Sequence, residues 1–359
     1  MPDQLRDDRD GLGVLCTQAA DWFSQARGRN VLPEVIEKDF WVTELLRQLS
    51  KISQIARTTS AKGQHPVQVR AIFKGGTSLS KAYGIIQRFS EDADVYLSMT
   101  RFPGLQPEGK FAGASSPKFG IGKTRIDTIM KVVAEEIGAP LALTPAPYGQ
   151  ATSGVKRTFV YDYPRALSAG RPENDLKQFV QLDLVRMGTP TPNAPHDIGS
   201  MLAEHIRNEQ PAILNDFEEF SSFRIDVLAP ERTLVDKLCI LNTLGIRVQS
   251  GDYELRWQAR HYYDVAMLLT TASVLDGLRS QPGMVSEYAA DAHADSKELR
   301  RSTSERPKDG FAASVAFCDP KVVAHARVEY EREMSQLALG HFPDFDEVLA
   351  AVRGNANLL

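Results

Sequence analysis

The stretch FKGGTSLSKAYGIIQRFSEDADV, residues 73–95, carries the strongest structural signal in this chain. The overlapping run RAIFKGG, residues 70–76, contains β-branched and aromatic residues and ends in the paired glycines Gly75 and Gly76. The segment TSLSKAY, residues 77–83, is typical of a helix, and DADVYLS, residues 92–98, alternates like a strand. The sequence therefore predicts a strand, a glycine turn, a helix and a second strand in succession.

Two carboxylates stand at alternate positions of the second strand, at Asp92 and Asp94. Side chains alternate between the faces of a strand, so these two point the same way, roughly 6–7 Å apart. Carboxylates held this close repel each other unless a cation lies between them. Mg²⁺ (or Mn²⁺) would suit the pair, because such ions take one or two protein carboxylates and complete their shell with water and phosphate oxygens. The alternative is a solvated strand edge, since Asp-x-Asp alone is a common pattern.

The glycine turn before the helix is suited to binding a triphosphate. Free backbone N–H groups and the positive end of the helix dipole can face the phosphates there. Gly75 and Gly76 allow a close approach to the backbone, and Thr77 and Ser78 can add hydroxyl donors. The alternative is a plain turn with a helix cap. The spacing matches neither a dinucleotide-binding G-x-G-x-x-G motif nor a Walker loop.

A third carboxylate often completes a site of this kind, where it positions or deprotonates the attacking hydroxyl. Asp183 is the candidate, because it interrupts the apolar strand FVQLDLV, where an unpaired buried charge would be costly. Asp226 in FRIDVL is the alternative, although its neighbours alternate in a way that predicts a solvent-facing position. Burial cost alone favours Asp183.

The rest of the chain divides into a mixed half and a helical half. Helices are predicted at 11–27, 33–49, 123–137 and about 196–208, and strands at 155–163, 177–187 and 223–228. After Pro230 the patterns are helical, at 231–245, 256–271, 285–294, 320–339 and 344–353. We therefore expect an α+β protein with one domain at 1–229 and a helical domain at 230–359.

Two charged positions stand out in the helical half. Lys237 lies at the margin of the apolar stripe of its helix, and Asp236 points away from that stripe. Lys237 could reach a cleft between the domains and hold a phosphate, or it could extend its amine to solvent. Arg260 and Asp264 are four residues apart, a spacing that predicts an ion pair within one helix.

Composition limits the class of protein. The 359 residues are 42% hydrophobic and 25% charged, with a formal net charge of −4, which excludes a strongly basic nucleic-acid binder but not a local basic cleft. The three cysteines lack the spacing of a zinc site or a disulfide framework. No apolar run is long enough to span a membrane, and the N-terminus lacks a signal sequence, so we expect a cytoplasmic protein without a membrane partner.

The motif at 73–95, together with ERTLVDKL and RHYYDVAMLL further on, resembles the AbiEii family of nucleotidyltransferase toxins in the DNA polymerase β-like superfamily. The resemblance covers roughly residues 33–270. It implies a polymerase β-like nucleotidyltransferase core with a small mixed sheet, followed by an α-helical C-terminal domain that closes over the nucleotide.

The resemblance also implies roles for individual residues. Asp92 and Asp94 would bind the metal and the triphosphate, and Lys237 and Asp264 match the lysine and the acidic residue of the family's later motifs, so we expect all four to be catalytic. Asp183, chosen from its burial alone, is expected to join Asp92 and Asp94 as a catalytic carboxylate and metal ligand. The predicted nucleotide-binding residues share a position at the glycine turn, the helix after it or the later lysine motif: Gly75, Gly76, Thr77, Ser78, Lys81 and Lys237.

The implied activity is NTP-dependent transfer of nucleotides to an RNA acceptor, such as the 3′ end of tRNA. This activity would block translation as the toxin of a toxin–antitoxin or phage-exclusion system with a cognate antitoxin. A basic path for RNA is expected from Lys74, Lys81, Arg88, Lys118, Lys123, Arg125 and Lys131. The alternatives are a nucleotidyltransferase acting on a protein or a small molecule, and an inactive module that only binds nucleic acid or a partner.

Overall fold

The computed structural model describes residues 4–52, 56–57, 67–90, 92–101, 123–152, 155–167, 177–186, 189–298 and 304–359. Within these residues the centre is an eight-stranded mixed sheet in the order β4-β5-β6-β3-β2-β8-β7, with β1 also paired to β2. The strands are β1 (Ala56–Arg57), β2 (Val67–Lys74), β3 (Asp92–Arg101), β4 (Pro145–Thr152), β5 (Lys156–Tyr161), β6 (Val180–Val185), β7 (Asn193–Ile198) and β8 (Phe223–Leu228). The predicted α+β class is confirmed.

The register of the central strands determines where the chemistry lies. β2 and β3 are antiparallel, and Lys74 at the end of β2 pairs with Asp94 near the start of β3. β6 runs parallel to β3 on the other side, and Asp94 pairs with Asp183. Residues far apart in the sequence therefore meet at one end of the sheet, where β2 continues into α3 (Gly75–Lys81).

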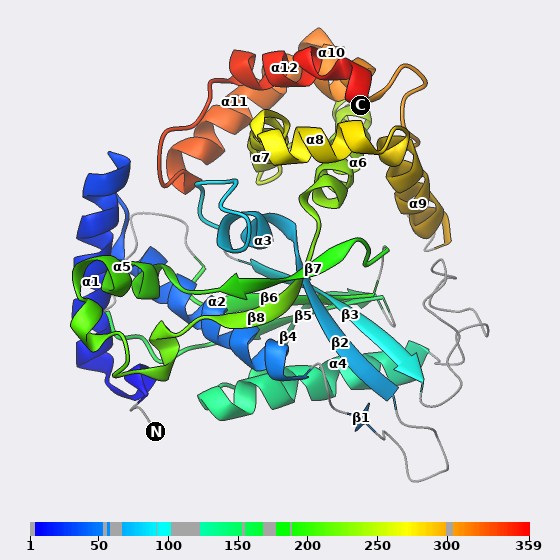
Figure 1. Ribbon diagram of the computed structural model, residues 1–359. Coiled ribbons are helices and arrows are strands. Elements are labelled where there is room, and N and C mark those ends of the chain that lie inside the picture. Colours follow the sequence, from blue (N-terminus) through cyan, green and yellow to red (C-terminus); the bar gives the residue numbers. More distant parts are fainter. Residues whose placement is uncertain are drawn as a thin grey trace.

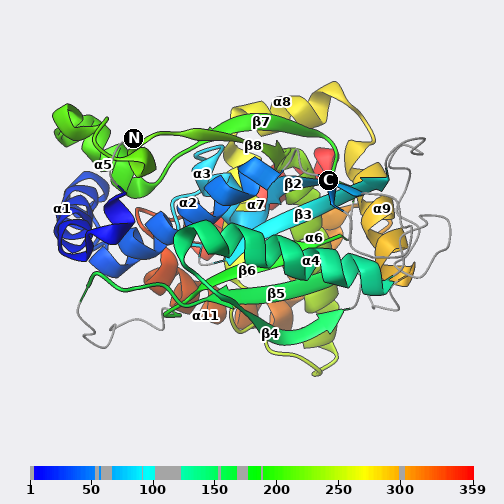
Figure 2. The ribbon, with the colours of Figure 1, turned by 90° about the horizontal axis from the view of Figure 1, so that it is seen from below.

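Long helices cover the lower face of the sheet in Figure 1. Figure 2, seen from below, shows α2 and α4 lying across this face. Their apolar side chains form one hydrophobic core with the sheet. The helices of this part are α1 (Arg9–Arg27), α2 (Pro33–Ile52), α4 (Lys123–Gly138) and α5 (Met201–Glu209).

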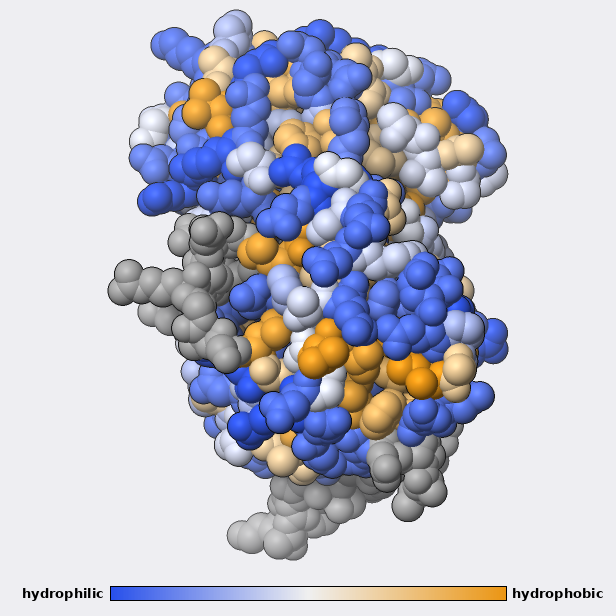
Figure 3. Space-filling view, turned by 90° about the vertical axis from the view of Figure 1, so that its left-hand side faces the viewer, coloured by the Kyte–Doolittle hydropathy of each residue, from blue (hydrophilic) through white to orange (hydrophobic). Residues whose placement is uncertain are grey.

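The C-terminal helices gather above the opposite face, where Figure 3 shows a constriction between the two parts of the molecule. They share a second hydrophobic core, which also takes in Leu79 of α3 and Ile86 of the segment that follows it. The glycine motif is thus packed against this core, which stabilises its position over the sheet. These helices are α6 (Pro230–Gln249), α7 (Arg260–Thr270), α8 (Ala272–Ser280), α9 (Met284–Glu298), α10 (Val315–Cys318), α11 (Pro320–Leu337) and α12 (Phe345–Gly354).

Three local predictions differ from the structure. The polar segments that form β4 and β7 pair as the outer strands of the sheet, where one face and one edge need no apolar alternation. The helix expected near 196 begins only at Met201, after β7. The helix expected from 256 begins at Arg260, because Trp257 has a φ of 63°, which is incompatible with a right-handed helix.

In the described ranges of the chain, no helix is both long enough and apolar enough to cross a bilayer.

Candidate active site

Gly75 brings the backbone against the carboxylate strand. Its φ is 82°, in the left-handed region that favours glycine. A Cβ atom at this position would lie 2.4 Å from Oδ2 of Asp94, so no other residue fits without displacing that carboxylate. The first glycine of the motif therefore allows both the turn and the close approach to Asp94.

The hydroxyls that follow the glycines are engaged within the motif. Thr77 donates to the backbone carbonyl of Asp92 and lies 2.8 Å from the Ser90 hydroxyl. Ser78 donates to the carbonyl of Gly75 at 2.8 Å. Both side chains are buried. In this structure they connect α3 to the start of β3 and stabilise the turn.

Three carboxylates come together at this end of the sheet. Asp94 lies beside Asp183 across the β3–β6 pair, and Asp92 is two residues before Asp94 on the same face of β3. Burial, followed by repulsion from Asp183, raises the pKa of Asp94 to about 6, although Lys74 and Lys156 lower it. The protonated form of Asp94 is thus favoured more than in an exposed carboxyl group, mainly because the group is buried.

Lysines neighbour the other two carboxylates, and no sequence signal distinguished them. Lys156 of β5 forms an ion pair with Asp183, which also accepts a hydrogen bond from the Thr158 hydroxyl. Nζ of Lys177 lies 3.4 Å from Oδ1 of Asp92. Within the described part of the chain, no three His, Cys, Asp or Glu side chains already surround a metal position.

Asp226, the alternative third carboxylate, lies in a different environment. It accepts a hydrogen bond of 2.7 Å from Nε of Arg70. Its strand, β8, pairs with β2, where Asp226 lies opposite Ile72, and not with β3, which carries Asp92 and Asp94. Asp183 is therefore the carboxylate that adjoins Asp94.

A buried charge cluster joins the motif to the helical half. Arg88 binds Asp264 of α7 through Nε and Nη2, at 2.7 and 2.8 Å, and Nζ of Lys237 on α6 lies 2.6 Å from the same carboxylate. The ion pair predicted between Arg260 and Asp264 is wrong, because Asp264 is saturated by these two cations. All three members of the cluster are at most 4% exposed.

Burial and ion pairing act in opposite directions on the groups of this cluster. Burial opposes ionisation of Asp264, but Arg88 and Lys237 outweigh it and hold the pKa of this carboxyl well below its usual range. Burial lowers the pKa of Lys237 while Asp264 opposes that shift, and burial together with Lys237 lowers the pKa of His261 to about 3. His261 is therefore neutral, and the side chains of Arg88 and Lys237 both contact the one carboxylate of Asp264.

Arg88 connects this cluster to the glycine turn. A Cβ atom at Gly76 would lie 2.5 Å from Nη2 of Arg88, so the second glycine leaves room for the guanidinium. Sequence reasoning placed Arg88 only on a surface path, because nothing local reveals a partner 176 residues away.

The expected basic path is only partly described by the structure. Lys81, predicted to bind nucleotide, forms a buried ion pair with Asp39, with Nζ 2.6 Å from Oδ1. Arg88 is buried as well, so neither side chain contributes to an exposed path. Lys131 is exposed on α4, below the sheet in Figure 1. Lys118 and the side chains of Lys123 and Arg125 lie outside the described residues.

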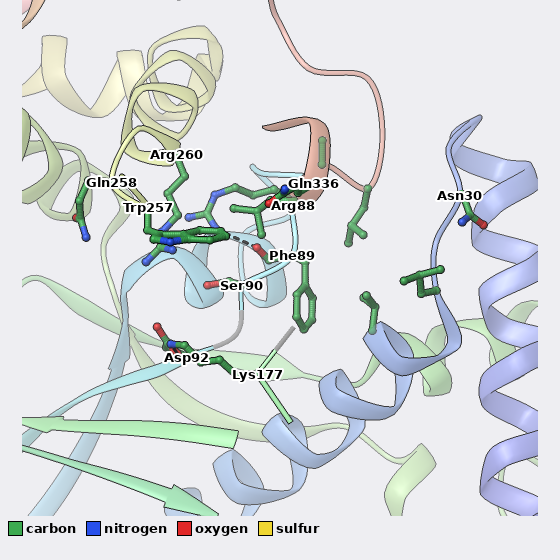
Figure 4. Close-up of a pocket in the computed structure, with 15 residues that line it drawn as sticks. Asn30, Arg88, Phe89, Ser90, Asp92, Lys177, Trp257, Gln258, Arg260 and Gln336 are labelled. Carbon is green, nitrogen blue, oxygen red and sulfur yellow. Dashed lines mark hydrogen bonds and ion pairs between the residues drawn. The ribbon is translucent and has the colours of Figure 1, made fainter. Parts of the chain in front are cut away.

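A cavity of about 380 Å³ opens beside Asp92, where the sheet, the helical half and the α1–α2 connection meet. Figure 4 shows Trp257 and Arg260 on one side of it, Asp92 and Lys177 on another, and Phe89 and Ser90 between them. Arg88 also lines this space, whereas Lys237 and Asp264 lie behind Arg88 in the charge cluster. A ligand here would contact residues of both parts of the chain.

Comparison with known proteins identifies the chain's relatives. A family model described as nucleotidyl transferase AbiEii toxin, type IV TA system, matches residues 62–351. No curated protein matches the chain. Among solved structures, MenT4, the nucleotidyltransferase toxin Rv2826c from Mycobacterium tuberculosis H37Rv, is 15% identical with a TM-score of 0.47, over 96% of this chain and 96% of that chain. The family match spans the glycine turn, all three carboxylates and the buried charge cluster, and the chain belongs to the AbiEii nucleotidyltransferase toxin family of type IV toxin–antitoxin systems.

Proposed function

We propose that this nucleotidyltransferase moves a nucleotide from an NTP to an RNA acceptor, such as the 3′ end of tRNA, in a reaction that depends on Mg²⁺ or Mn²⁺. The observation that carries the proposal is the meeting of Asp94 with Asp183 and Asp92 beside Gly75. The glycine turn and the three carboxylates are thereby held together at one end of the sheet.

The donor set fits a divalent cation held partly by substrate. Mg²⁺ is usually bound by one or two carboxylates plus water and phosphate oxygens, rather than by a complete protein cage. Asp92 and Asp94 are the proposed metal ligands, with Asp183 as the third. A bound cation would neutralise charge on the triphosphate and reduce the repulsion that raises the pKa of Asp94.

The protein's own residues have distinct proposed roles. Asp183 orients the acceptor hydroxyl and accepts its proton, as the hydroxyl oxygen bonds to the α-phosphorus and pyrophosphate leaves. This role requires the ammonium of Lys156 to release Asp183 when substrate binds. The backbone N–H groups of Gly75 and Gly76 are the proposed contacts of the triphosphate, while Lys237 and Arg88 supply positive charge from the buried cluster.

The toxin family implies an antitoxin partner and an NTP substrate. We propose that modification of tRNA blocks translation in the cytoplasm and that the antitoxin prevents this, with phage exclusion as one use of such a system. The acceptor is the part of the proposal that needs a direct test.

The test incubates the full chain with each of the four α-labelled NTPs, Mg²⁺, and either total cellular RNA or total protein. We expect label in RNA of tRNA size, sensitive to ribonuclease and abolished by EDTA or by Asp94→Asn. Label found in protein instead would show that the acceptor is a protein and not RNA. Transfer that persists in EDTA, or in the Asp94→Asn variant, would contradict the metal site.

A further inference from the structure

The cavity beside Asp92 has features that the transfer chemistry does not account for. Its volume of about 380 Å³ lies within the range of about 300–1,000 Å³ typical of small-molecule sites. Its walls include two aromatic rings, Trp257 and Phe89, contributed by opposite parts of the chain. Figure 4 shows the indole of Trp257 projecting into the space, with Asp92 and Lys177 across from it.

Trp257 is held in an unusual conformation at this wall. Its φ of 63° is rare for a large residue, and 38% of its surface is exposed. Backbone outliers of this kind persist where surrounding structure enforces them, and they cluster at ligand sites. An aromatic ring exposed in a cavity at the cost of backbone strain is suited to contact a ligand.

A buried carboxylate holds this turn from behind. Glu333 of α11, only 1% exposed, accepts a hydrogen bond of 2.8 Å from the backbone N–H of Arg260 at the start of α7. Burial raises the pKa of Glu333, against the opposing effect of the backbone N–H groups of Arg260, Ala259 and Trp257. The segment 257–260 is thereby fixed to α11, which presents Trp257 to the cavity in one orientation.

Polar groups beside the indole complete the wall. Arg260 lies next to Trp257 in Figure 4 and lines the cavity, and its positive charge also lowers the pKa of Glu333 behind the turn. Gln336 lines the same cavity from the end of α11. A planar ring could therefore stack on the indole while its polar edge meets donors from two helices.

We infer that this cavity binds a nucleobase, stacked on Trp257, with the attached sugar and phosphates directed toward Asp92. The inference deepens the proposed function and rests on it for the nature of the ligand. Aromatic stacking accepts every base, because each base has a π face, so Trp257 contributes affinity while Arg260 and Gln336 contribute discrimination. The base belongs either to the NTP or to the end of the acceptor RNA.

The experiment measures equilibrium binding to the full chain in Mg²⁺, for wild type, Trp257→Ala and Trp257→Phe. The probes are each NTP, inorganic tripolyphosphate, a single-stranded oligoribonucleotide, and the same oligonucleotide with an abasic 3′ terminus. We expect Trp257→Ala to weaken binding of the base-containing probe by about tenfold or more, and Trp257→Phe to stay close to wild type. Tripolyphosphate and the abasic oligonucleotide should not distinguish the variants.

The two sources give different outcomes. A loss confined to NTPs assigns the cavity to the incoming nucleotide, and a loss confined to the oligonucleotide assigns it to the acceptor. Quenching of tryptophan fluorescence by the same probe should disappear in Trp257→Phe although binding remains. Matching thermal unfolding of the three proteins checks that the partly exposed side chain is not needed for folding.

Equal affinities of wild type and Trp257→Ala for both NTPs and oligonucleotide would overturn the inference, as would a wild type that binds neither. The proposed function fails separately. A wild type that binds NTP through Trp257 but labels no RNA would refute the RNA acceptor and leave the base site in place. RNA labelling that is unaffected by Trp257→Ala would refute the base site and leave the RNA acceptor in place.

Discussion

A Cβ atom at Gly75 would stand 2.4 Å from a carboxylate oxygen of Asp94, so the turn and the aspartate strand form a single unit. The contact joins β2, where the motif begins, to the central acidic residue of the proposed site. The effect of backbone strain can be separated from the loss of the site by experiment, because Gly84 also has a positive φ.

Gly75→Ala should abolish transfer, and Gly84→Ala should not. Both glycines have positive φ, 82° and 63°, so alanine costs backbone strain of roughly 1 kcal/mol or more at each. Only at Gly75 does the added methyl displace Asp94, since nothing lies within 4 Å of a Cβ at Gly84. Denaturant unfolding and NTP turnover measure the two effects. Similar turnover in the two variants would show that the contact with Asp94 is unimportant.

Asp183→Asn should lose transfer by at least a hundredfold, whereas Asp226→Asn should retain it. Asp183 adjoins Asp94, and general base contributions are about 10²–10⁴-fold. Asp226 is occupied by Arg70 at 2.7 Å. Single-turnover rates with saturating NTP provide the comparison. If Asp226→Asn is the impaired variant, the third carboxylate has been assigned to the wrong strand.

Asp94→Asn should stabilise the metal-free fold at neutral pH. The pKa of Asp94 is raised from 3.8 to about 6, so the folded state favours its protonated form. Its contribution to stability is fully present below about pH 4 and is lost as the pH rises through about 6. The Asn variant should therefore exceed wild type by on the order of 1–3 kcal/mol at pH 7.5 in EDTA.

Urea unfolding at pH 4.5 and 7.5 tests this expectation, with the same variant serving as its own control across pH. The advantage of Asp94→Asn should shrink at pH 4.5, and added Mg²⁺ with NTP should stabilise wild type but not the variant. An advantage independent of pH would mean that Asp94 carries no uncompensated charge.

Local patterns were sufficient to predict the glycine turn, the aspartate strand and α6. The turn follows from the freedom of glycine, and the shared face of Asp92 and Asp94 follows from strand alternation. β4 and β7 were missed because outer strands need no apolar alternation, and the start of α7 was misplaced because the φ of Trp257 depends on tertiary contacts.

Long-range partners were beyond the reach of such patterns. Lys156 meets Asp183 only through the β5–β6 register, and Arg88 meets Asp264 across 176 residues. Asp264 shows the difficulty: the spacing from Arg260 predicted a local ion pair, but packing supplied two other cations. The burial of Asp183 was predictable from its apolar neighbours, whereas its position beside Asp94 required the sheet order.

Asp264→Asn should destabilise the protein by about 3–5 kcal/mol, because it leaves Arg88 and Lys237 buried without their carboxylate. Asp346→Asn is the matched control, since Asp346 also pairs with an arginine, Arg327, but is 73% exposed. That variant should unfold close to wild type. Chemical denaturation at pH 7 gives both values, and equal stability of the two variants would refute the buried cluster as a structural element.

Lys237→Met should weaken NTP binding about tenfold while costing less stability than Asp264→Asn. Methionine keeps much of the volume, and Arg88 still holds Asp264 through two hydrogen bonds. The variant removes, however, the amine that we propose the cluster offers to a triphosphate. Asp236→Ala is the control on the same helix, because Asp236 is 31% exposed and lies 3.7 Å from Arg232, outside the cluster. Calorimetric titration of the two variants with NTP and Mg²⁺ should separate them by that tenfold difference. Equal affinities would mean that Lys237 serves packing alone and that the charge reaching the phosphates comes from Arg88.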